Sequence, residues 1–215
     1  MIITEKDKIR ILIADDHPIF RQGLKFALNE NEDMEVCGEA ANGIELLEKV
    51  SEDNYSVVLL DISMGGQNSL DTLKQLKINK PKLPVLILSV YPEDTFAVRF
   101  IKAGAAGYLT KEKDSEILMG AIRKIASGGR FTSQELTEKL AFDFAGQTKP
   151  PHEYLTDREY QVFALIVQGN ALTKIGQDLG LSVKTIGTHR THILEKMKMQ
   201  NNAQLIQYAI LNKIV

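Results

Sequence analysis

The first 127 residues alternate short, continuously apolar runs with longer segments that carry apolar residues at helical spacing. Continuous Val, Ile and Leu runs are typical of strands buried on both faces, whereas helical spacing indicates one apolar face. The strand-like runs are Arg10–Asp15, Met34–Ala41, Ser56–Asp61, Pro84–Ser89 and Ala106–Thr110. The helix-like segments are Ile19–Asn29, Gly43–Glu52, Leu70–Lys77, Thr95–Ala103 and Ser115–Ser127. Five such units predict an α/β fold of the flavodoxin-like type, a doubly wound five-stranded parallel sheet.

The last 64 residues carry only helical patterns and predict a separate all-α domain of four helices. Thr156 and Glu159 have the spacing of a capping box, and Gly180 indicates a tight turn between the two middle helices. The expected helices run from Thr156 to about Val167, over Ala171–Leu179, from Ser182 to about Met197, and over Asn202–Leu211. Two helices joined by a short glycine turn are typical of a helix-turn-helix.

The segment between these two parts reads as a linker. Gly128 and Gly129 end the α/β pattern, residues 134–144 have the spacing of one more helix, and the run GQTKPP breaks any regular element. We therefore predict a first domain over residues 1–127, a linker with one helix over residues 128–151, and a helix-turn-helix domain over residues 152–215.

Charge and composition narrow the class of protein. The net charge of −2 divides unevenly: residues 1–127 hold 16 basic and 20 acidic residues, whereas residues 152–215 hold seven and five. The single cysteine, Cys37, excludes an internal disulfide and a cysteine-rich metal site. The amino terminus has no apolar signal core, and no stretch approaches the length of a membrane span. We expect a cytoplasmic protein with no membrane partner.

Functional side chains follow the strand-like runs of the first domain. Asp15 and Asp16 end the first run, Asp61 the third and Ser89 the fourth, and Lys111 follows the fifth. Because the carboxyl ends of parallel strands meet at one edge, these side chains are expected to converge. Three carboxylates repel one another unless a cation neutralises them, and an all-oxygen ligand set suits Mg²⁺. Taken alone, each of these residues would be interpreted as a turn former or as an ordinary surface group.

His17 follows the paired aspartates directly. We interpret this histidine as a loop or helix-cap residue and not as a ligand.

Residues 8–127 resemble the receiver domain of response regulators, through the stretches ILIADDHPIFRQGL, VVLLDISM, LILSV and GAAGYLTK. The resemblance implies that Asp61 accepts a phosphoryl group from the phosphohistidine of a sensor histidine kinase. It implies that Asp15 and Asp16 hold Mg²⁺ together with Asp61, and that Ser89 and Lys111 contact the phosphoryl group. Tyr108 matches the aromatic switch residue that turns inward on activation. The alternative interpretation is an ordinary half-buried aromatic residue of a strand, without a role in switching.

The stretch from Leu155 to Met197 resembles the LuxR-type helix-turn-helix of response regulators of the NarL/FixJ type. The resemblance implies binding of double-stranded DNA, with the helix after Ser182 in the major groove. It implies DNA contacts by Lys184, Thr185, Thr188, His189, Arg190 and Lys196. Gly187 stands where the family commonly has Lys, so we expect one contact fewer and an altered site preference.

Together the two resemblances imply a transcription regulator whose phosphorylation switches DNA binding and homodimerisation. Relatives use the last helix, Asn202–Leu211, to dimerise on DNA, although its apolar residues can equally pack the domain core. The resemblance implies that the protein is not an enzyme, except that it catalyses phosphoryl transfer to itself and its own dephosphorylation.

Three alternatives remain open at this stage. One is a Mg²⁺ phosphatase or phosphotransferase with Asp61 as nucleophile, although such enzymes usually place an acid where this chain has Ser63. A second is a receiver that is never phosphorylated, attached to a constitutive DNA-binding or protein-interaction module. A third is a carboxy-terminal domain that binds protein instead of DNA.

Overall fold

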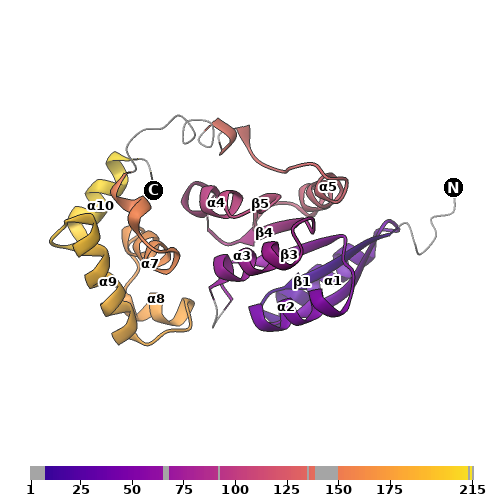
Figure 1. The fold of residues 1–215 in the computed structure, drawn as a ribbon, viewed down its shortest axis with the longest axis horizontal. Helices are drawn as coiled ribbons and strands as arrows, with labels where there is room; N and C mark the ends of the chain where they lie inside the picture. The colour runs from indigo at the N-terminus through magenta and orange to yellow at the C-terminus, as the bar shows by residue number, and fades with distance from the viewer. Residues whose placement is uncertain are drawn as a thin grey trace. The chain divides into compact units, whose positions relative to one another are not determined.

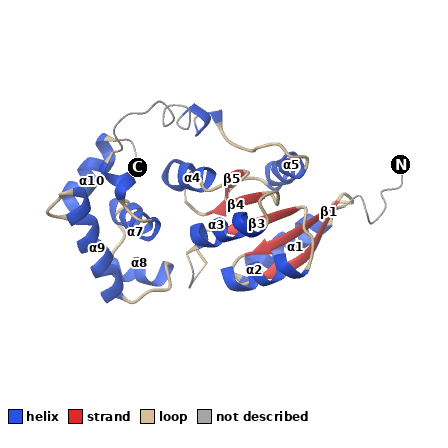
Figure 2. Ribbon diagram, viewed as in Figure 1, coloured by secondary structure: helices blue, strands red, loops and turns tan. Residues whose placement is uncertain are grey.

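A computed structural model describes residues 8–64, 68–91, 93–134, 136–138, 150–212 and 214. The chain divides into two compact units, Met1–Thr137 and Glu138–Val215. Figure 1 traces both units along the chain, and Figure 2 separates helix from strand. Most of the predicted linker helix over residues 134–144 lies outside the described residues. The exact domain boundaries therefore stay a prediction.

The first unit is the predicted doubly wound α/β fold. Its strands are β1 (Ile9–Ala14), β2 (Met34–Ala40), β3 (Val57–Asp61), β4 (Val85–Ser89) and β5 (Gly107–Thr110). Its helices are α1 (Pro18–Asn29), α2 (Gly43–Glu52), α3 (Ser69–Asn79), α4 (Glu93–Lys102) and α5 (Ser115–Ala126). All neighbouring strands are parallel, in the order β2-β1-β3-β4-β5. This is the flavodoxin-like order, whose switch point lies between β1 and β3.

The sheet is buried on both faces, which explains the continuous apolar runs. Every residue of β3 and β4 is buried. Alternate strand residues such as Ile11 and Leu59 pack against α1 and α5, through residues that include Leu28 and Ile122. The intervening residues point to the opposite face, because side chains alternate along a strand.

Residues just beyond the predicted first domain complete the edge of the sheet. The backbone N–H of Phe131 donates to the carbonyl of Ala106, and Gly107 forms an isolated parallel bridge with Phe131. The beginning of the predicted linker therefore pairs with the exposed edge of β5.

Over residues 150–212, the second unit contains a short 3₁₀ helix and four α-helices. They are η2 (Pro151–Tyr154), α7 (Asp157–Val167), α8 (Leu172–Asp178), α9 (Val183–Met197) and α10 (Asn202–Leu211). The α7 helix is central, since its residues from Glu159 to Val167 are all buried. The predicted capping box of Thr156 and Glu159 is confirmed.

The turn between α8 and α9 is tight. Gly180 adopts a φ of 63°, a left-handed conformation that favours glycine. Gly176 lies so close to the carbonyl of Leu181 that a Cβ would approach the oxygen to 2.8 Å. Ser182 then caps α9 by accepting a hydrogen bond from the backbone N–H of Thr185. These local contacts position α9 as the second helix of a helix-turn-helix.

Candidate functional site

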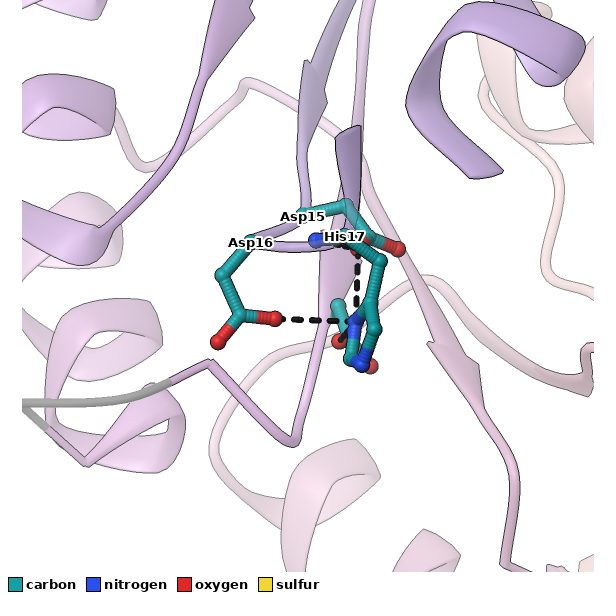
Figure 3. Close-up of side chains that lie close together, drawn as sticks. Asp15, Asp16 and His17 are labelled. Carbon is teal, nitrogen blue, oxygen red and sulfur yellow. Dashed lines mark hydrogen bonds and ion pairs between the residues drawn. The ribbon is translucent and has the colours of Figure 1, made fainter. Parts of the chain in front are cut away.

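Two buried aspartates meet where β1 and β3 end, at the switch point of the sheet. Asp15 directly follows β1 and Asp61 is the last residue of β3. Each is only 1% exposed. Asp16 and His17 complete a group in which one potential ligand atom from each residue lies within 4.8 Å of the others. Figure 3 shows Asp15, Asp16 and His17 gathered at this point.

Lys111 supplies the positive charge nearest to these carboxylates. Its Nζ lies 2.7 Å from Oδ2 of Asp15 and 3.1 Å from Oδ2 of Asp61. The ammonium also lies 4.4 Å from the centre of the Phe20 ring, a cation–π distance. The predicted convergence of Asp15, Asp61 and Lys111 is therefore present in the fold.

Asp61 is held in a state that favours a further cation. Burial raises the pKa of its carboxyl group; the charge of Lys111 opposes this effect and the charge of Asp15 adds to it. Both carboxylate oxygens are buried. Lys111 and the backbone of Ser63 interact with this carboxylate, which leaves part of its capacity to accept about four hydrogen bonds unused. A buried carboxylate with open lone pairs is costly unless something coordinates it. This donor set, oxygen-rich and short of hydrogen bonds, fits a divalent metal ion.

His17 is a residue of this site that sequence reasoning did not select. It occupies the N-cap of α1, but its side chain makes no capping hydrogen bond. Instead, its Nδ1 lies 2.9 Å from Oδ1 of Asp16, 3.2 Å from Oδ1 of Asp15 and 3.9 Å from Oδ2 of Asp61. The dashed lines in Figure 3 mark the contacts of the ring with its neighbours. The only sequence signal for it was its position beside two aspartates.

Ser89 and Tyr108 form a second polar group near the same edge. Ser89 is completely buried at the end of β4, the strand that pairs with β3. Its Oγ accepts a hydrogen bond from the backbone N–H of Tyr91 at 2.8 Å. The hydroxyl of Tyr108 donates to the carbonyl of Tyr91 at 3.0 Å. Tyr108 is 2% exposed, and its burial raises the pKa of the phenol well above the usual range. The ring therefore lies inward in this structure.

The second helix of the helix-turn-helix, α9, presents some of the predicted DNA contacts to solvent. Lys184 and Thr188 are exposed, and Thr185 and His189 are partly exposed. Burial lowers the pKa of His189, and the nearby charge of Arg158 lowers it further.

Two other predicted DNA contacts have partners within the second unit. The Nε of Arg190 donates to Oδ1 of Asn202 at 2.7 Å. The Nζ of Lys196 donates to Oε2 of Glu159 at 2.6 Å. Burial would raise the pKa of Glu159, but hydrogen bonds from Lys196 and Thr156 outweigh it and hold that pKa below its usual range. Lys196 therefore stabilises the capping box of α7.

The two units match two known families. Residues 11–123 match the family described as "Response regulator receiver domain". Residues 153–209 match the family described as "Bacterial regulatory proteins, luxR family". The chain belongs to the DNA-binding two-component response regulators. The two resemblances drawn from the sequence are thereby confirmed. The family is one of transcription regulators, as the sequence predicted, and not of classical enzymes.

Other response regulators resemble the chain along nearly its whole length. The oxygen regulatory protein NreC of Staphylococcus epidermidis is 33% identical over 216 residues, which cover 96% of this chain and 99% of NreC. NreC of Staphylococcus carnosus is 32% identical over 215 residues, with the same coverage.

Solved structures of response regulators share the fold. ChrA, a response regulator of a heme-sensing two-component system, is 28% identical with a TM-score of 0.51, over 97% of this chain and 100% of ChrA. RcsB from Salmonella enterica serovar Typhimurium, bound to promoter rprA, has a TM-score of 0.60 at 23% identity, over 94% and 98% of the two chains.

Among the described residues of this response regulator, no helix is long and apolar enough to cross a membrane.

Proposed function

We propose that Asp61 is the phosphoacceptor of this response regulator and that its phosphorylation controls DNA binding by α9. The observation that carries the proposal is the state of Asp61. Asp61 is 1% exposed, and the Lys111 ammonium, 3.1 Å from its Oδ2 and 2.7 Å from Oδ2 of Asp15, bridges the two buried carboxylates. A carboxylate kept desolvated beside a fixed cation is suited to attack phosphorus.

The donor is the phosphohistidine of a sensor histidine kinase. A carboxylate oxygen of Asp61 forms the new bond to phosphorus as the bond from phosphorus to the kinase imidazole breaks. Asp15, Asp16 and Asp61 would hold Mg²⁺, which screens the charge of the incoming phosphoryl group. Lys111, whose Nζ lies 3.1 Å from Oδ2 of Asp61, balances the added negative charge. The same residues would support slow autodephosphorylation by water.

Ser89 and Tyr108 couple the phosphorylation of Asp61 to a conformational change elsewhere in the first unit. The Ser89 hydroxyl, at the end of the neighbouring strand, donates to a phosphoryl oxygen. Ser89 and Tyr108 already share the backbone of Tyr91 as hydrogen-bond partner. A shift of Ser89 toward the phosphoryl group therefore biases the position of Tyr108, which is how a local charge change selects one of two receiver states.

The output is sequence-specific binding of double-stranded DNA in the cytoplasm. The exposed residues Lys184 and Thr188, with Thr185 and His189, are the contacts that the geometry of α9 supports best. Arg190 and Lys196 reach DNA only if they leave Asn202 and Glu159. The protein acts as a homodimer when phosphorylated or bound to DNA, through α10.

A DNA titration tests the switch. Fluorescence anisotropy would follow binding to genome-derived fragments with and without a small phosphodonor and Mg²⁺, for the wild-type chain and Asp61→Ala. The donor is expected to tighten specific binding by the wild type and to leave Asp61→Ala unchanged. Equal binding by both proteins, with or without donor, would identify a constitutive DNA-binding module.

A further inference from the structure

The orientation of the His17 ring is not explained by its position on α1. The side chain is 64% exposed, so several directions are open to it. Although it is the N-cap residue, its side chain makes no capping hydrogen bond to the first turn of the helix. Its Nδ1 is instead directed at the carboxylates of Asp15 and Asp16 (Figure 3).

The spacing of these atoms corresponds to that of ligands around one ion. Around an octahedral ion with ligands at about 2.1 Å, neighbouring ligand atoms lie about 3.0 Å apart. Nδ1 of His17 lies 3.2 Å from Oδ1 of Asp15 and 2.9 Å from Oδ1 of Asp16. The other oxygen of Asp15, Oδ2, faces Lys111, so the two oxygens of this carboxylate serve different partners.

An independent observation indicates that the site takes a cation. Both oxygens of Asp61 are buried, its carboxylate lies close to that of Asp15, which raises its pKa, and Oδ2 lies 3.9 Å from the His17 Nδ1. Lys111 compensates only part of the negative charge of Asp15, Asp16 and Asp61.

We propose that His17 is a direct metal ligand at this site, which gives the receiver a mixed nitrogen and oxygen ligand set. The inference rests on the proposed metal-dependent function of the Asp61 site. Mg²⁺ prefers oxygen ligands and gains little from an imidazole, whereas Mn²⁺ and later transition ions accept imidazole readily. Loading of this response regulator therefore depends on which divalent ion is present.

Pulsed electron paramagnetic resonance with Mn²⁺ as the probe tests this ligand directly. An imidazole bound to Mn²⁺ gives a ¹⁴N coupling that carboxylates and water do not give. The full-length wild type is expected to show this coupling with substoichiometric Mn²⁺, and His17→Ala is expected to lose it. Ile19→Ala is the matched control, because this side chain is 87% exposed and apolar on the first turn of the same helix. His17→Gln is a second variant, in case alanine at the N-cap disturbs folding.

Binding constants provide a second readout. His17→Ala and His17→Gln are expected to weaken Ni²⁺ binding at the Asp61-dependent site by about tenfold, and Mg²⁺ binding by no more than about threefold.

Each other outcome overturns the proposal in a distinct way. Mn²⁺ binding that requires Asp61 but shows no ¹⁴N coupling would make His17 a hydrogen-bond partner only, with the metal site intact. A coupling that persists in His17→Ala would come from another nitrogen. Tighter Mg²⁺ binding by His17→Ala would make the ring a competitor of the ion. Mn²⁺ binding that Asp61→Asn leaves unchanged would overturn both this inference and the proposed Asp61 metal site.

Discussion

At the scale of single residues, the chemistry of Asp61 conflicts with the stability of the fold. The buried carboxylate is close to another buried carboxylate, Asp15, and burial raises its pKa. The folded protein therefore binds this proton more tightly than the unfolded chain does. Without metal, the free energy of unfolding should fall as the pH rises from the ordinary carboxyl pKa of 3.8 through the raised value.

Removing this charge should stabilise the metal-free protein. Asp61→Asn is expected to have a higher free energy of unfolding than the wild type at pH 7, and to lose that part of the pH dependence. Urea denaturation between pH 4 and pH 8, followed by circular dichroism, measures both effects. Asp71→Asn is the control, since Asp71 has a side chain that is 58% exposed. An Asp61→Asn protein less stable than the wild type at pH 7 would contradict the account.

Some residues of this site could be predicted from the sequence and others could not, for a physical reason. Strand ends in a parallel sheet share one edge, so Asp15, Asp61 and Lys111 were predictable without coordinates. The direction of a side chain on a loop depends on the groups around it, so the role of His17 was not. The partners of Arg190 and Lys196 lie on other helices, and helical spacing within α9 contains no information about them.

At the scale of elements, caps and turns were predictable because they depend on near neighbours. Thr156, Ser182 and Asn201 each accept a hydrogen bond from a backbone N–H three residues later. By contrast, the addition of Phe131 to the sheet depends on a distant strand and was interpreted as linker.

Two lysines of α9 should separate stability from DNA binding. Lys196→Met removes one of the hydrogen-bond partners of the buried Glu159 and is expected to destabilise the second unit by about 1–2 kcal/mol, a value reduced because Lys196 is 39% exposed. Lys184→Met should leave stability within about 0.5 kcal/mol and weaken DNA binding. Urea unfolding and anisotropy on the same two proteins compare them. The assignment fails if Lys196→Met weakens DNA binding with no change in stability.

Replacing Gly187 on α9 should raise either the stability of the helix or its affinity for DNA, depending on the side chain introduced. A Cβ at this position would meet no atom within 4 Å. Gly187→Ala is expected to stabilise α9 by about 1 kcal/mol. Gly187→Lys should add a phosphate contact and steepen the salt dependence of DNA binding by about one ion. Thermal unfolding and anisotropy titrations over a range of salt concentrations measure these effects; an unchanged salt slope for the lysine variant would place position 187 away from the DNA.

At the scale of the whole molecule, α10 has a buried face and an exposed apolar face. Leu205 and Ala209 are fully buried, whereas Ile210 and Leu211 are 61% and 75% exposed. Core packing therefore leaves Ile210 and Leu211 available for the proposed dimer contact.

Ile210→Asp should weaken dimerisation without unfolding the domain. Binding to a fragment with two half-sites is expected to weaken by about 100-fold, because the gain from linked binding is lost, while binding to one half-site stays unchanged. Ile78→Asp, an equally drastic change at a side chain that is 80% exposed on α3, serves as control. Equal losses on both fragments would point to a folding defect in place of a dimer interface.

The pairing of Phe131 with the edge of β5 also matters for anyone who recombines these domains. The backbone nitrogen of Tyr108 lies 3.4 Å from the Phe131 carbonyl oxygen, so the strand that carries the proposed switch residue is hydrogen-bonded to the segment that follows α5. A chimera spliced at Gly128 would discard this segment and leave a bare strand edge, which favours aggregation. A splice after Thr137, where the first compact unit ends, would keep the pairing of Phe131 with β5 and so the covered edge.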